Sequence, residues 1–250
     1  GRQSNSGPPR SSFVYDGGMK KSVAVAVLFL AAALPVAAGE MPEGMVSYQL
    51  VLLRGGPGET KYADERELQA MQEERLAWLG RLHAEGTAIV SGPIWQGGDL
   101  RGALVLDVPS RQEAEAVLAG DPWVRAGREA PEIHPWWCGR ETFRKTTNLV
   151  RLVRTWLVLL SRPENAPAYD EAKLQEIQAA HLAHIAGLAA SGDLVAAGPF
   201  GDGGKLRGVL VLRTLEAERV RSLIAQDPAV RAGRLGAAAV QWSVPEGSLP

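Results

Sequence analysis

The sequence predicts an α+β protein built from two copies of one domain. Residues 64–127 align without a gap with residues 170–233, and 27 of these 64 positions are identical. Within each copy, segments rich in Val and Leu alternate with longer segments whose apolar residues follow helical spacing. The offset of 106 residues indicates a duplicated domain, because the repeating units of solenoid proteins run to about 20–50 residues.

Identical segments anchor this alignment. They form three pairs: Gly92-Pro93 with Gly198-Pro199, Asp121-Pro122 with Asp227-Pro228, and Leu50–Leu53 with Leu157–Leu160. The third pair is offset by 107 residues, so one copy has a loop that is one residue longer. One description of the elements therefore serves both copies.

The first part of the second copy predicts a strand, a helix and another strand. Residues 149–160 are rich in Val and Leu, which is typical of a strand. A helix of about 20 residues is expected from Asp170, since apolar residues recur at helical spacing until Gly192, which favours a helix end. The short apolar run 194–197 predicts the next strand and leads to Gly198-Pro199.

The rest of the second copy predicts a strand, a helix and a last strand. A glycine-rich turn at residues 201–204 leads into the strand expected at 207–212. Residues 215–225 predict a second helix, and residues 237–242 predict the final strand. The first copy shows the same order, with its long helix at residues 64–85.

This order of elements is that of a ferredoxin-like βαββαβ domain. Both helices of such a domain lie on one face of the sheet, so the other apolar face needs a cover. We predict one domain at 46–137, a linker at 138–148 and a second domain at 149–244, paired as an intramolecular α+β barrel. Two independent domains are the alternative, which the short linker disfavours.

Residues 19–38 have the form of a secretory signal peptide. Met19 and two lysines precede an apolar run of about 12 residues, shorter than the roughly 20 of a membrane-spanning helix. Small residues at 36–38 fit a cleavage site, and an uncleaved anchor is the alternative. We expect a periplasmic or secreted protein without stable membrane insertion after cleavage. The polar residues 1–18 are expected to be an expression remnant or a misplaced start.

The charge balance argues against a nucleic-acid partner. The net charge is −1, and it is −4 without residues 1–38, which hold four basic residues and one acidic residue. Binding to nucleic acid or to an anionic membrane depends on clustered positive charge. Cys138 is the only cysteine, so no internal disulfide is expected. We expect Cys138 to pack, and a nucleophilic role beside His134 is the less favoured alternative.

Three segments of the second copy resemble the YCII-related family. They are His181-Leu182-Ala183, Leu194–Pro199 and Asp227–Gly233. Counting the corresponding positions of the first copy, the resemblance covers residues 48–136 and 150–243. It implies the dimeric α+β barrel fold, which family members normally form from two separate chains. This chain would be a fused, single-chain version of that dimer.

The resemblance also implies a catalytic site. The family is associated with a catalytic His and Asp pair, which by position would be His181 and Asp227. The first copy keeps Asp121 but has Arg75 in place of the histidine. Gln178 stands where the family favours Arg. Some members resemble dehydrochlorinases of chlorinated aromatic diols and triols, which implies lyase or isomerase chemistry on a small aromatic or lactone-like substrate.

A His and Asp pair can move a proton without a cofactor. The carboxylate orients the ring and favours its charged form, and the ring can take a proton from a phenol or a carbon acid. We expect no cofactor and no metal, because no third ligand accompanies His184 and His181. The alternatives are a packed helical histidine satisfied by a backbone carbonyl and, for Asp227, a turn or helix cap before Pro228.

Four further residues are candidates for contact with a substrate, namely Gly198, Pro199, Arg207 and Arg231. The alternatives are a hairpin shaped by the glycine and proline, and structural ion pairs for the arginines. The function expected from the sequence is an exported lyase or isomerase that acts on a small-molecule ligand. The alternative is a non-catalytic binding or structural module.

Overall fold

The computed structural model describes residues 41–59, 64–213 and 216–250. The predicted signal peptide and residues 1–18 lie outside the described residues. The first half contains β1 (Met45–Gly55), α1 (Glu65–Glu85), β2 (Ala88–Trp95), β3 (Leu100–Leu106), α2 (Arg111–Leu118), α3 (Pro122–Arg125) and β4 (Glu129–Gly139). The second half contains β5 (Leu152–Ser161), α4 (Glu171–Ala190), β6 (Leu194–Pro199), β7 (Leu206–Leu212), α5 (Ala217–Gln226), α6 (Pro228–Arg231) and β8 (Gly236–Pro245).

The observed elements follow the predicted order and add two short helices, α3 and α6. Each begins at the proline of an Asp-Pro pair, because proline suits the first position of a helix and aspartate suits the position before it. Asp121 accepts a hydrogen bond of 2.8 Å from the Trp123 N–H, and Asp227 accepts one of 2.8 Å from the Ala229 N–H. The turn expected at these two positions is therefore a capped helical turn.

The strands form one antiparallel sheet that closes on itself. Its order is β4-β1-β3-β2-β8-β5-β7-β6, so the two halves join where β2 pairs with β8. At the ends of this sheet, Trp136 of β4 forms a bridge with Phe200, and the Gly201 N–H donates a 2.8 Å hydrogen bond to the Pro135 carbonyl. The predicted intramolecular barrel is confirmed.

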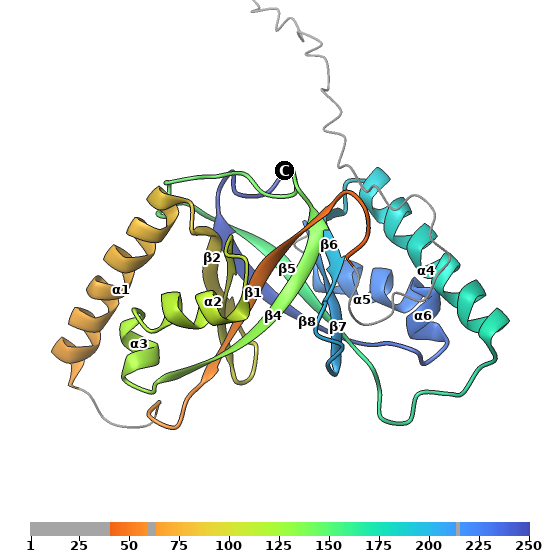
Figure 1. Ribbon diagram of the computed structural model, residues 1–250, viewed down its shortest axis with the longest axis horizontal. Helices are drawn as coiled ribbons and strands as arrows, with labels where there is room; N and C mark the ends of the chain where they lie inside the picture. The colour runs from red at the N-terminus through yellow and green to blue at the C-terminus, as the bar shows by residue number, and fades with distance from the viewer. Residues whose placement is uncertain (1–40, 60–63, 214–215) are drawn as a thin grey trace, which may run out of the picture.

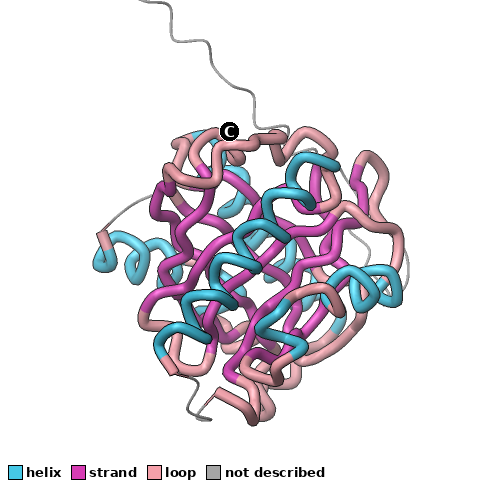
Figure 2. Tube along the Cα trace, turned by 90° about the vertical axis from the view of Figure 1, so that its left-hand side faces the viewer, coloured by secondary structure: helices cyan, strands magenta, loops and turns pink. Residues whose placement is uncertain are grey.

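The helices lie outside this barrel. Figure 1 shows α1–α3 on one side of the strands and α4–α6 on the other, and Figure 2 shows helices crossing the outer face of the strands. Both halves contribute buried side chains to the barrel interior, among them Trp136 and Trp242. A separate core lies between helices and sheet in each half. None of the described helices is long and apolar enough to cross a membrane.

The two seams between the halves explain a pair of repeated glycines. A Cβ atom on Gly92 would stand 1.8 Å from the Ser243 carbonyl oxygen of β8. A Cβ atom on Gly198 would stand 1.8 Å from the Trp137 carbonyl oxygen of β4. Because these neighbours are backbone atoms held in a sheet, only glycine allows the strands of opposite halves to approach so closely.

Candidate functional site

The structure brings His181 and Asp227 together in the second half. The Nδ1 atom of His181 lies 2.9 Å from Oδ1 and 2.8 Å from Oδ2 of Asp227. His181 lies on the buried face of α4 with Ile177 and Ile185, and Asp227 caps α6. Only 9% and 3% of the two side chains are exposed, so the pair is held by rigid elements in a largely dry environment.

Asp227 is ionised in this setting. Burial by itself raises the pKa of a carboxyl group, but the hydrogen bond and charge of His181 and the Ala229 N–H together hold the pKa of Asp227 below its ordinary value. An ionised carboxylate can only accept hydrogen bonds. The Nδ1 atom of His181 therefore carries a proton and donates it to Asp227.

The other ring nitrogen of His181, Nε2, lies in a side chain that is 9% exposed. It has no hydrogen-bond partner among the described residues, and it is not one of their fully buried unpaired atoms. Nε2 therefore keeps some contact with solvent. A ring that is oriented through Nδ1 and accessible at Nε2 has the arrangement required of a general acid or base.

The space beside Asp227 is small. His184 and Asp227 line a cavity of about 10 Å³ together with leucine side chains, which is room for about one water molecule. His184 itself donates from Nε2 to the Leu223 carbonyl oxygen, at 3.1 Å. A substrate of the pair would therefore approach the Nε2 side of His181 and not this cavity.

The corresponding position of the first half is a structural ion pair. Arg75 replaces the histidine and lies 3.3 Å from Asp121 and 2.7 Å from Glu129. Glu129 occupies the position of Leu235 in the second half, so the extra carboxylate accompanies the extra positive charge. The Arg75 guanidinium also lies over the Trp123 ring, at 5.6 Å. Arginine does not give up its proton in proteins, so this position cannot act as a base.

The four residues predicted to contact a substrate lie on β6, β7 and α6. Gly198 and Pro199 are in the seam strand β6, and Arg207 donates to the Gly203 and Gly204 carbonyls at 3.0 and 3.2 Å. Arg231 is an exposed residue at the end of α6. The Arg231 backbone N–H donates a 2.9 Å hydrogen bond to the Asp227 carbonyl oxygen. Among the described residues, no side-chain hydrogen bond or ion pair joins these four to His181 or Asp227.

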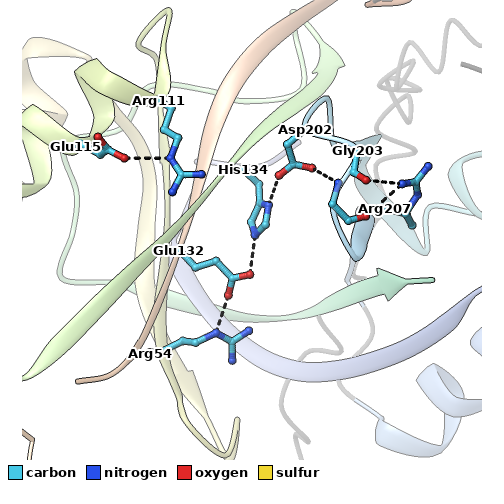
Figure 3. A network of polar contacts seen from close by, with 9 residues as sticks. Arg54, Arg111, Glu115, Glu132, His134, Asp202, Gly203 and Arg207 are labelled. Carbon is cyan, nitrogen blue, oxygen red and sulfur yellow. Dashed lines mark hydrogen bonds and ion pairs between the residues drawn. The ribbon is translucent and has the colours of Figure 1, made fainter. Parts of the chain in front are cut away.

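Sequence reasoning missed a cluster around the buried His134, which Figure 3 shows between two partly exposed carboxylates. Its Nδ1 lies 2.6 Å from Asp202 and its Nε2 lies 3.0 Å from Glu132. Burial opposes ionisation of Glu132, but Arg54 and His134 hold its pKa below the ordinary value. Because Asp202 belongs to the second half, the cluster ties the two halves together. Val240 aligns with His134, so the repeat carried no signal for it.

Cys138 is inert in this structure. Burial raises the pKa of its thiol to about 12, which a hydrogen bond with Thr142 only partly offsets. The nucleophilic form of cysteine is the thiolate, and both ring nitrogens of His134 already contact carboxylates. The expectation that Cys138 packs rather than reacts is therefore supported.

The fold defines a dimeric α+β barrel in which one chain supplies both halves. The YCII-related domain matches residues 51–137 and 155–241, and the chain belongs to this family. No curated protein matches the sequence.

Solved structures share the fold at low sequence identity. A heme-binding protein from Thermus thermophilus is 12% identical with a TM-score of 0.52, and the match covers 84% of this chain and 95% of that one. A variant of chlorite dismutase from Candidatus Nitrospira defluvii in complex with cyanide is 11% identical with a TM-score of 0.53, and the match covers 80% and 90%. At such identity the likeness shows the fold alone.

Proposed function

We propose that the second half of this protein is a proton-transfer site that works without a cofactor, as a lyase or isomerase of a small aromatic or lactone-like molecule. One observation carries the proposal: ionised Asp227 holds His181 through Nδ1, while Nε2 of the same ring reaches solvent. We further propose that residues 19–38 direct export, so that the reaction takes place in the periplasm or outside the cell.

In this mechanism, His181 Nε2 takes a proton from a carbon acid or a phenol. The charge that appears on the ring is stabilised by Asp227, whose nearer oxygen lies 2.8 Å from Nδ1. In an isomerisation, the ring returns the proton to another carbon of the substrate. In an elimination, chloride leaves with the electron pair of the broken bond, and the ring releases its proton to water, so that HCl is lost overall.

The contrast between the halves supports a single site. Where the second half has its histidine, the first half has Arg75, which pairs with both Asp121 and Glu129. The first half therefore serves as the partner that completes the barrel, and the second half alone carries the reactive ring.

Solvent exchange gives the most sensitive test of this proposal. The full chain is incubated in D₂O with a panel of unsaturated lactones and chlorinated hydroxyquinols, and incorporated deuterium and released chloride are measured. His181→Gln should lower the exchange rate by about 10²–10⁴-fold, the contribution typical of a positioned general base. His184→Gln is the matched control on the same helix and should keep the rate. Equal rates in wild type and His181→Gln would refute the proposal.

A non-catalytic binding or structural module is the second candidate. It is favoured by the role of Asp227 as a helix cap, because Asp121 caps α3 at the same distance of 2.8 Å in the half without the histidine. On this alternative, no compound of the panel exchanges a proton, and His181→Gln changes only the free energy of unfolding.

A further inference from the structure

The second half contains an open apolar cleft between α5 and the outer face of the sheet. Its volume is about 430 Å³. We call it the α5 cleft. Its floor and walls include Trp156, Ala237, Ala239, Val220, Ile224 and Val230. Among the described residues of the lining, Arg221 is the one that carries a charge; it lies at the rim, where it pairs with Glu218 and remains 66% exposed.

Sequence differences between the halves create this cleft. Ala239 pairs with Val158 in the sheet, and its counterpart in the first half is Ile133, which is only 2% exposed and belongs to the core under the helices. Ala237 likewise stands where the first half has Pro131. The helix α5 therefore lies over alanines where α2 lies over a filled surface. The space follows from these side chains and not from the fold.

The floor of the cleft suits a flat ring. Trp156 is partly exposed on the helix-facing side of β5 and packs at the edge of the second-half core. Beside Trp156, on the neighbouring strand β8, the small side chains of Ala237 and Ala239 leave room above the sheet. Aromatic rings gain both apolar burial and favourable stacking on an indole, and a guanidinium at the rim can attract a polar or anionic group.

We propose that the α5 cleft binds a small planar aromatic molecule, with the ring on Trp156 and the alanine floor and a polar or anionic group toward Arg221. Neither His181 nor Asp227 lines the cleft, so this inference goes beyond the proposed function. Ile224 and Val230 line both the cleft and the small cavity beside Asp227. A bound ring would therefore be separated from the pair by one layer of side chains.

Calorimetric titration of the full chain with 1-naphthoate tests the proposal, with quenching of indole fluorescence as a second readout. Wild type should bind one molecule per chain, and Trp156→Phe should remove the quenching. Ala239→Ile should fill the cleft and weaken binding at least about 10-fold, while the chain stays as stable as wild type because the first half accommodates Ile133. Ala238→Ile is the matched control, since successive residues of a strand face opposite sides, and it should bind as wild type does.

Ala237→Leu provides a second filled variant on the same face of β8, which keeps the test decisive should Ala239→Ile unfold. No binding at millimolar 1-naphthoate, or wild-type binding by both filled variants, would overturn the proposal. An equal loss of affinity for 1-naphthoate in Ala239→Ile and Ala238→Ile would also overturn it. His181→Gln should bind 1-naphthoate normally, so failure of the proton-transfer proposal and failure of this one give different results.

Discussion

Replacing Gly198 with Ala should open the barrel at one of its seams. The added Cβ would stand 1.8 Å from the Trp137 carbonyl oxygen and 2.8 Å from the Trp136 Nε1 atom. Real Cβ atoms essentially never approach other atoms closer than 3.0 Å, so β6 must move away from β4 by roughly 1 Å. That movement breaks the hydrogen bond of 2.8 Å from the Gly201 N–H to the Pro135 carbonyl.

The size of the effect follows from these two losses. Forced overpacking costs about 1–3 kcal/mol, and loss of a backbone hydrogen bond costs about 1 kcal/mol. The free energy of unfolding should therefore fall by about 2–4 kcal/mol. Urea denaturation measures it. Gly187→Ala is the control, because a Cβ on this α4 residue would meet nothing within 4 Å and alanine favours a helix by about 1 kcal/mol.

The other seam offers an internal check. Gly92→Ala places a Cβ 1.8 Å from the Ser243 carbonyl oxygen, so it should cost as much as Gly198→Ala. If either variant were as stable as wild type, the two halves would not meet as described.

Three further predictions concern the buried polar groups. The folded pKa of Asp227 is lowered, so its stabilising effect over Asp227→Asn should be full at neutral pH and disappear on acidification below about pH 4. A urea series across pH measures this, and an advantage that grows in acid would contradict it. Asp202→Ala should cost about 1–3 kcal/mol, because it leaves a buried nitrogen of His134 unpaired; thermal unfolding would show no change if the cluster did not join the halves. The double substitution Arg75→His with Glu129→Leu should create a second His and Asp pair, with Asp121 as the carboxylate. Added to His181→Gln, it should restore proton exchange. Continued absence of exchange would mean that the pair alone is insufficient.

The repeat and the apolar spacing were enough to predict the order of the long elements and the pairing of the halves. Helices α3 and α6 were missed because four residues are too few to show a helical period. The final strand was expected at residues 237–242 and spans Gly236–Pro245, since Gly236 and Pro245 are residue types with weak strand propensity. These differences are local, whereas the fold depends on the pattern as a whole.

Only part of the candidate site could be predicted from the sequence. The contact between His181 and Asp227 spans 46 residues and was expected from the family resemblance, because no local pattern encodes it. The contact between His134 and Asp202 spans 68 residues and crosses between the halves, so it depends on the closed barrel. The α5 cleft depends on the size of side chains such as Ala239, which matters only once the strand register is known.

Nitrogen-15 NMR of His181 tests the central claim most directly. With labelled histidine in the intact chain, the account predicts that Nδ1 is protonated at neutral pH and that its proton exchanges slowly with water. Asp227→Ala should abolish that slow exchange, while His184→Gln should preserve it. An unprotonated Nδ1, or a signal that Asp227→Ala leaves unchanged, would show that the pair does not exist and that the second half has no oriented base.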